Sequence, residues 1–144
     1  MWSLNTYPGA FNTEDGRGRL NAKGDTIIPP NYMATGNLSD GMHIVRAKNE
    51  KWGAYNSNGK LIIEPQFDDL WHFYEGVANF SLNEKWGFVN KKGEIVIKPK
   101  FDYASQFNNG FAYVELEGKS GFINKKGEIV IPIIYDPCRM TRME

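Results

Sequence analysis

The sequence predicts an all-β protein built from about four repeats of 34–35 residues each, and three observations support this fold class. The first is a glycine series with intervals of 35, 34 and 34 residues: Gly18, Gly53, Gly87 and Gly121. The second is an asparagine series with the same intervals: Asn21, Asn56, Asn90 and Asn124. The third is that the apolar runs between these positions are short and bounded by turn residues, which is typical of strands.

The copy that begins at Lys85 shows what each part of the repeat forms. The segments 86–90 and 94–98 are predicted strands, and Asn90-Lys-Lys-Gly93 between them is a predicted hairpin loop. Glycine suits the left-handed conformation that such a loop requires. The run Ile95-Val96-Ile97 does not alternate, which favours a strand covered on both faces. Pro99 ends this strand because proline donates no ladder hydrogen bond.

The second half of the repeat, residues 101–110, is predicted to form a single helical turn. Asp102 is placed to cap its start and Gly110 to close its end. A strand over residues 111–115 follows. Each unit is therefore expected to be a three-stranded antiparallel meander plus a short capped helical turn. The units would be arranged as a curved solenoid or as a small propeller-like array, and the sequence does not choose between them.

The whole chain, residues 1–144, is expected to fold as a single repeat domain, because one copy alone buries too little apolar surface. It divides into a degenerate repeat and three fuller ones: 1–41, 42–76, 77–110 and 111–144. In the last repeat Asp136-Pro137 is suited to begin a helical turn.

The composition and the first residues of the chain limit which partners and which cellular location are expected. The formal net charge is zero with charges of both signs interspersed, so neither nucleic acid nor a membrane surface is expected as a partner. The first residues lack a charged start and an apolar core, so the expected location is the cytoplasm. Because Cys138 is the single cysteine, no internal disulfide is possible, and this residue is expected to be a small, partly buried hydrophobe.

Lys51-Trp-Gly and Lys85-Trp-Gly, with Asn-x-x-Gly, Pro-x-aromatic-Asp and a late glycine in register, resemble the WG-repeat family of β-rich repeats, common in bacterial proteins. The resemblance covers residues 17–136 and is strongest over 51–136. Gly18 and Gly121 lack the preceding tryptophan. The resemblance implies an interaction scaffold, and it supplies no common catalytic residues to carry over.

Residues that depart from the repeat's own pattern are candidates for a binding site. Trp71, His72 and Tyr74 stand where another copy has small or polar residues, so the fold does not require them. Two aromatic residues beside a histidine are typical of an interface hot spot. The alternative is that they fill a gap against a neighbouring unit.

Recurring charged residues favour structural roles over chemistry. Asp68, Asp102 and Asp136 are explained as helix caps, with calcium binding as the alternative. Lys51, Lys85 and Lys119 are expected to protect strand edges from aggregation. Glu64, Asp68 and Asp69 form the densest acidic group, which is the basis for a hydrolytic alternative. His43, His72 and Cys138 show no spacing that indicates a catalytic group.

The function expected from the sequence is a non-enzymatic protein-binding module with no catalytic residue, cofactor or metal. Its partner would be another protein, and a dedicated inhibitor such as an immunity protein against a bacterial toxin fits the size of the chain. Two alternatives stay open. One is a carbohydrate-binding or hydrolytic protein that uses aromatic and acidic residues, and the other is a purely structural repeat array, which calcium could stabilise.

Overall fold

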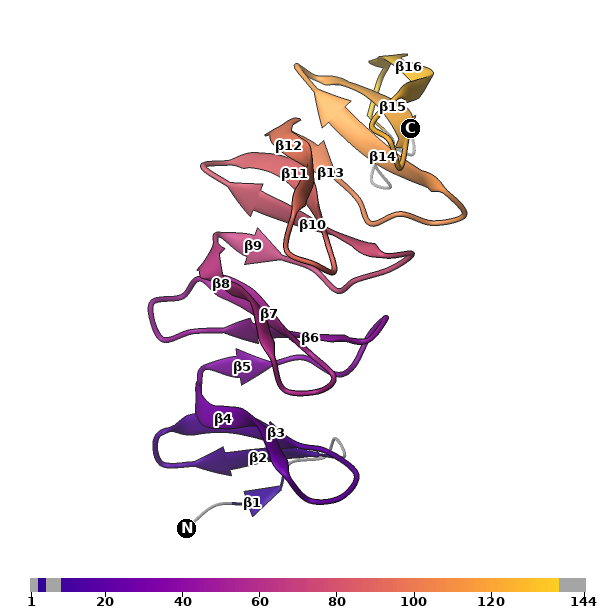
Figure 1. Cartoon of the computed structure of the whole chain (residues 1–144). Helices are drawn as coiled ribbons and strands as arrows, with labels where there is room; N and C mark the ends of the chain where they lie inside the picture. Colours follow the sequence, from indigo (N-terminus) through magenta and orange to yellow (C-terminus); the bar gives the residue numbers. More distant parts are fainter. Residues whose placement is uncertain (1–2, 5–8, 138–144) are drawn as a thin grey trace, which may run out of the picture.

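The computed structural model describes residues 3–4 and 9–137. Every regular element in these residues is a β-strand, and the sixteen strands form four four-stranded antiparallel sheets, which confirms the all-β prediction. Figure 1 shows the sheets following one another in chain order, with the first and fourth sheets at opposite ends of the array. Each repeat thus supplies the long strands of one sheet, and the sheets do not close into a barrel. The short first strands of the second, third and fourth sheets, Ala34–Thr35, Asp69–Leu70 and Tyr103–Ala104, come from the end of the preceding repeat.

Each sheet contains four consecutive strands. The first is made of β1 (Ser3–Leu4), β2 (Ala10–Thr13), β3 (Gly16–Leu20) and β4 (Thr26–Tyr32). The second is made of β5 (Ala34–Thr35), β6 (Met42–Arg46), β7 (Trp52–Asn56) and β8 (Leu61–Phe67). The third is made of β9 (Asp69–Leu70), β10 (Val77–Leu82), β11 (Lys85–Asn90) and β12 (Ile95–Phe101). The fourth is made of β13 (Tyr103–Ala104), β14 (Phe111–Leu116), β15 (Lys119–Asn124) and β16 (Ile129–Tyr135).

The hairpin loop predicted from Asn-x-x-Gly is confirmed between β11 and β12. The side-chain oxygen of Asn90 accepts hydrogen bonds from the backbone N–H groups of Lys92 and Glu94, at 2.9 Å each. Gly93 adopts a φ of +84°, in the left-handed region. Asn56 and Asn124 make the same two bonds in their own loops.

The helical turn predicted over residues 101–110 is wrong. Tyr103 and Ala104 instead form β13, which pairs with β14 at Glu115 and Val114. A tight turn follows, in which Asn108 and Phe111 exchange backbone hydrogen bonds of 2.9 and 3.2 Å around two residues with positive φ. The edge of β14 is available for pairing with this segment. The ladder hydrogen bonds formed there stabilise the segment more than a single helical turn would, because such a turn has few hydrogen bonds of its own.

Asp102 therefore does not cap a helix. Its carboxylate lies 2.5 Å from Nζ of Lys85 and accepts the backbone N–H of Glu117 at 2.7 Å. Glu117 has a φ of +52° in the turn between β14 and β15, so Asp102 stabilises a hairpin turn instead of a helix end. Gly110, the expected helix end, lies in the tight turn after Asn109 with a φ of +87°. The expected helical turn after Pro137 falls on residues 138–144, outside the described residues.

The apolar cores lie between consecutive sheets. Between the second and third sheets, Phe67 stacks on Phe80 with ring centroids 4.2 Å apart. Between the third and fourth sheets, Phe88 and Phe107 lie 4.7 Å apart. A third cluster joins Ile28 and other residues of the first sheet to the second. Each sheet thus buries its apolar face against the next one, as expected when a single repeat cannot form a core alone.

The expectation that Ile95, Val96 and Ile97 are covered on both faces is also wrong. Ile97 is 5% exposed and belongs to the core between the third and fourth sheets, whereas Ile95 is 49% exposed. Val96 is exposed as well. β12 is an edge strand of its sheet, so its first residues face solvent although they are apolar. The prediction that Pro99 ends the strand is wrong as well, because β12 continues to Phe101, and an edge strand tolerates proline.

Candidate functional site

Trp71 lies in the segment after β9 and spans the junction between the third and fourth sheets. Its ring meets Trp86 of β11 edge-on at 5.9 Å and Tyr103 of β13 at 6.4 Å. Even so, 41% of its surface is exposed. The side chain is therefore supported on two rings while a large apolar area remains in contact with solvent.

His72 and Tyr74 are placed differently from Trp71. His72 is half-buried, and a Cβ built on Gly36 of the second sheet's β5–β6 connection would lie 3.0 Å from its Cε1. Nδ1 of His72 is buried without a hydrogen-bond partner in the described part of the chain. Tyr74 is exposed. The predicted trio thus divides: Trp71 contacts the following repeat, His72 packs against the preceding one, and Tyr74 faces solvent.

An aromatic row, which we define as Trp71, Trp86, Tyr103, Tyr113 and Phe122, continues from Trp71 onto the fourth sheet. Trp86 and Tyr103 are 5.6 Å apart, Tyr103 and Tyr113 are 6.3 Å apart, and Tyr113 and Phe122 are 5.8 Å apart. Sequence reasoning singled out only Trp71 as a site residue in this row. Tyr113 lies two residues after Phe111 and therefore on the same face of the predicted strand 111–115. This spacing could have indicated that the aromatic row continues onto that strand.

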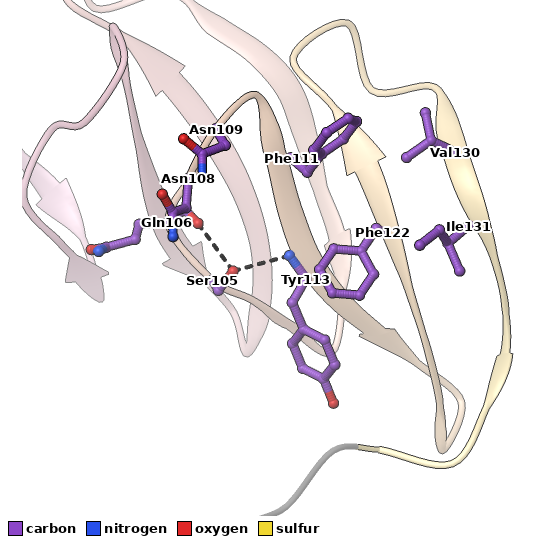
Figure 2. Close-up of a pocket in the computed structure, with 9 residues that line it drawn as sticks. All are labelled: Ser105, Gln106, Asn108, Asn109, Phe111, Tyr113, Phe122, Val130 and Ile131. Carbon is purple, nitrogen blue, oxygen red and sulfur yellow. Dashed lines mark hydrogen bonds between the residues drawn. The ribbon is translucent and has the colours of Figure 1, made fainter.

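A pocket of about 590 Å³ lies at the far end of the aromatic row, on the fourth sheet. Figure 2 shows apolar side chains on one side of it and the polar segment after β13 on the other. Its lining residues are Ser105, Gln106, Asn108, Asn109, Phe111, Tyr113, Phe122, Val130 and Ile131. Sequence reasoning did not predict this pocket.

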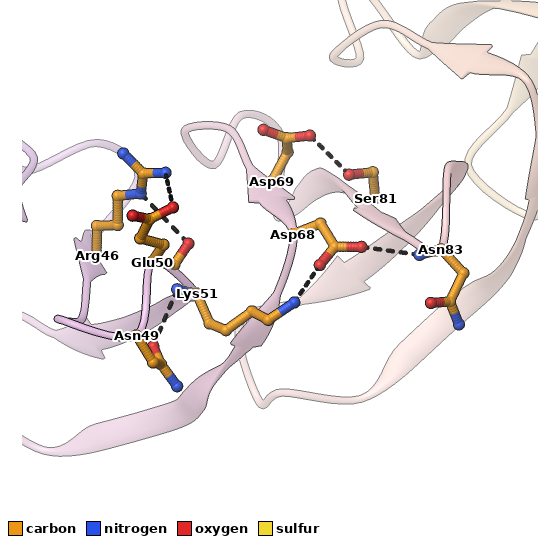
Figure 3. A network of polar contacts seen from close by, with 8 residues as sticks. All are labelled: Arg46, Asn49, Glu50, Lys51, Asp68, Asp69, Ser81 and Asn83. Carbon is orange, nitrogen blue, oxygen red and sulfur yellow. Dashed lines mark hydrogen bonds and ion pairs between the residues drawn. The ribbon is translucent and has the colours of Figure 1, made fainter.

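Two members of the acidic group Glu64, Asp68 and Asp69 make contacts within the protein, as Figure 3 shows for the two aspartates. Asp68 lies 2.5 Å from Nζ of Lys51 and accepts the backbone N–H of Asn83 at 2.8 Å. The lysine and then this N–H hold the pKa of Asp68 below its ordinary value. Asp69 accepts a hydrogen bond from the hydroxyl of Ser81 at 2.8 Å. Glu64 is exposed in β8.

The recurring lysines and aspartates pair with one another. Lys51–Asp68 and Lys85–Asp102 each lie 2.5 Å apart, and Lys119–Asp136 lies 3.1 Å apart. The lysines thus serve as partners for the carboxylates. The prediction that they protect strand edges is wrong, because they lie at or directly before the start of β7, β11 and β15, which are inner strands of their sheets. Within the described residues, no three side chains of the metal-binding types His, Cys, Asp and Glu gather into a group that could hold an ion.

A second set of carboxylates links one repeat to the next. Glu75 accepts the N–H groups of Asn109 and Gly110, at 2.6 and 2.9 Å, and lies 3.3 Å from Nζ of Lys125. The N–H of Gly110, and then those of Asn109 and the lysine, lower the pKa of Glu75. One repeat earlier, Asp40 accepts the N–H of Gly76 at 2.6 Å. Sequence reasoning missed this link, although both carboxylates directly precede the late glycine of the repeat.

The histidines do not assemble a catalytic group in the described structure. His43 is buried, and its Nδ1 lies 2.9 Å from the carbonyl of Gly36. Burial lowers the pKa of His43, more than the carbonyl contact raises it. Cys138, the candidate partner considered above, lies outside the described residues.

Comparison with known families accounts for the repeat pattern. The model of the WG containing repeat matches residues 20–52, 52–86, 86–119 and 121–140. No curated protein matches the chain. No helix in the described residues is long and apolar enough to cross a membrane. The four matches cover most of the chain, which therefore belongs to the WG-repeat family.

Proposed function

We propose that this WG-repeat chain is a non-enzymatic protein-binding module whose binding surface centres on Trp71, with Tyr74 and His72 beside it. The observation that carries the proposal is the exposure of Trp71, 41% of whose surface faces solvent although the ring packs on its neighbours. Tryptophan and tyrosine are enriched among residues that dominate binding energy, because they bury a large area with few rotatable bonds.

The support beneath Trp71 favours a preorganised site. Trp86 and Tyr103 hold the indole edge-on from two sheets, which limits the rotamers that Trp71 can adopt before a partner arrives. A side chain that is already ordered loses less conformational entropy on binding. The rigid sheets thus supply the base, and the exposed ring supplies the contact area.

The contacts of the acidic residues favour binding over the hydrolytic alternative. Asp68 and Asp69 are each engaged by neighbours, Lys51 and Asn83 for the former and Ser81 for the latter. A general acid in a glycosidase needs a raised pKa, whereas the pKa of Asp68 is lowered by its lysine partner. A purely structural array, in contrast, predicts no partner whose capture depends on Trp71.

The partner is another protein, and the role is that of a dedicated inhibitor or immunity protein of bacterial origin, acting in the cytoplasm. The chain acts as one domain over residues 1–144. The open succession of sheets in Figure 1 supports a curved solenoid over a propeller-like ring.

Affinity capture from a lysate of the source organism tests the proposal. The wild type is compared with Trp71→Ala, Tyr74→Ala and His72→Ala, and with Ile95→Ala as a control for an exposed apolar residue elsewhere. We expect one stoichiometric protein that the wild type and the control retain and that Trp71→Ala loses. Titration of the purified pair then gives the affinity change, which we expect to exceed about tenfold for a hot-spot residue. Equal capture by the wild type and Trp71→Ala would refute this surface.

A further inference from the structure

The second and third junctions of the array, between the second, third and fourth sheets, share one way of covering an apolar face. After the last strand of a sheet, the chain enters a short strand and then places a phenylalanine against the sheet it has just left. Leu70 and Phe73 do this on the second sheet, and Ala104 and Phe107 do it on the third. The covering segment thus has a leucine or alanine followed three residues later by phenylalanine.

Among the described residues, no segment covers the corresponding face of the fourth sheet. Phe122 and Ile131 follow Phe88 and Ile97 of the third sheet by 34 residues each. Ile97 is 5% exposed under the next repeat, whereas Ile131 is 42% exposed. Phe111, in the register of buried Val77, is 48% exposed. Phe111, Phe122 and Ile131 line the pocket of about 590 Å³. The pocket therefore corresponds to the place between Val77, Phe88 and Ile97 that Phe107 occupies one repeat earlier.

The last strand has lost the charges of its counterpart. β12 carries Lys98 and Lys100, and the same registers in β16 hold Pro132 and Ile134. Ile134 is exposed. Charged residues on an edge strand discourage pairing with other chains, so their replacement favours association at this end. A contiguous exposed apolar patch on a small protein commonly marks a site of interaction.

The fourth repeat carries a different residue at the register of this phenylalanine. Position 141, which follows Phe107 by 34 residues, is threonine and lies outside the described residues. Phe73 and Phe107 are both almost fully buried at this register, so the second and third junctions each have an aromatic ring there. Threonine carries much less apolar surface than phenylalanine.

We infer that the pocket on the fourth sheet binds an extended segment of another protein that carries a small or branched apolar residue and, three residues later, a phenylalanine. The phenylalanine enters between Phe111, Phe122 and Ile131, as Phe107 lies against Phe88 one repeat earlier. The side chains of Ser105, Gln106, Asn108 and Asn109 provide a polar rim for the backbone of the segment (Figure 2). This site is separate from Trp71, which does not line the pocket.

A peptide with the sequence of residues 102–110, which covers the third sheet within the chain, is a direct probe for the site. The full chain is titrated with this peptide, and with a version in which the phenylalanine is replaced by alanine, by calorimetry or by NMR. We expect saturable binding of the first peptide and at least about tenfold weaker binding of the second, because the ring supplies most of the buried area.

Matched protein variants locate the binding. Ile131→Ser changes a residue in the pocket and should weaken binding of the peptide by at least about fivefold, as expected for a centrally placed contact. Ile95→Ser changes an isoleucine that is 49% exposed on β12, outside the pocket, and should bind as the wild type does. Trp71→Ala should bind the peptide as the wild type does. A failure of this inference and a failure of the proposed function therefore give different results.

Three results would overturn the inference. They are no saturable binding to the wild type, equal binding of the alanine peptide, and equal binding by Ile131→Ser. Light scattering of the free chain measures its oligomeric state and so tests whether a second copy of this chain occupies the face. A dimer that Ile131→Ser dissociates, in a protein that does not bind the peptide, would assign the face to self-association instead.

Discussion

At the scale of single residues, the glycine of Trp86-Gly87 explains why this dipeptide recurs. A Cβ on Gly87 would lie 2.4 Å from the carbonyl oxygen of Ile97 and 2.7 Å from the nitrogen of Pro99. Both atoms belong to the backbone of β12, which cannot move aside without breaking its register with β11. Close approach of two strands, rather than an unusual φ, therefore requires glycine here.

Gly87→Ala should accordingly destabilise the protein strongly. We expect a loss of about 3 kcal/mol or more in the free energy of unfolding, measured by urea denaturation, because the clash is with backbone. Gly110→Ala is the comparison: no atom lies within 4 Å of its added Cβ, and only its φ of +87° is unfavourable for alanine. That substitution should cost about 1–2 kcal/mol. Equal losses for the two variants would contradict the close-approach explanation.

The sequence predicted some residues well and others not at all, for a physical reason. Asn90 and Gly93 act within five residues of each other, so their hairpin loop follows from local chemistry. Lys85 and Asp102 were interpreted separately, because their pairing depends on a fold that brings together residues 17 apart. The exposure of Trp71 depends on rings in two other strands, which no local pattern reveals.

At the scale of elements, Glu75 links the segment after β9 to the tight turn before β14. It accepts two backbone N–H groups there and approaches Lys125. Its pKa is lowered from the ordinary 4.5 in the folded protein. A lowered carboxyl pKa contributes stability above the ordinary value, and this contribution disappears as the pH falls through the folded-state pKa.

The melting temperature of Glu75→Gln, measured against pH, checks this link. At neutral pH the variant should melt below the wild type, because glutamine cannot supply the charge. Below pH 4.5 the difference should shrink and then vanish as Glu75 of the wild type becomes protonated. Glu64→Gln serves as the control, with an exposed carboxyl in the middle of β8. A difference that persists unchanged at low pH would contradict the electrostatic origin.

The wrong prediction for residues 101–110 shows where element prediction fails. Aspartate at the start and glycine at the end suit a helical turn locally. The outcome was decided by Val114 and Glu115, which offer a strand edge to Ala104 and Tyr103. Strand pairing between separate segments depends on what neighbours are available, so propensity within the segment does not determine it.

At the scale of the whole molecule, each sheet is stabilised through its junctions with its neighbours. Stability in such an array is a sum of repeat and junction contributions, and the end repeats have one junction fewer. Periodicity in the sequence was sufficient to predict the number of sheets. It could not predict the open pocket, because Phe122 and Ile131 have buried counterparts, whereas in the fourth sheet Phe122 is half-buried and Ile131 is exposed.

Phe107→Ala should weaken the last junction selectively. Phe107 is almost fully buried against Phe88, and its truncation should cost about 3–5 kcal/mol. Hydrogen exchange by mass spectrometry should then show lost protection in β14 and β15, while β6 and β7 keep theirs. Phe111→Ala, at an exposed position of the same sheet, should change protection little. A uniform loss across all four sheets would show that the array does not behave as a series of junctions.

The most direct test of the proposed binding function compares Trp71→Ala with Phe73→Ala, two residues further on. Both variants are melted, and both are used for partner capture. Phe73 is buried at the second junction, so its loss should cost about 3–5 kcal/mol. Trp71→Ala should cost only about 1–2 kcal/mol, from its edge-on contacts, and should lose the partner. If Trp71→Ala unfolds as readily as Phe73→Ala, or keeps the partner, Trp71 serves the fold and the proposed binding surface is wrong.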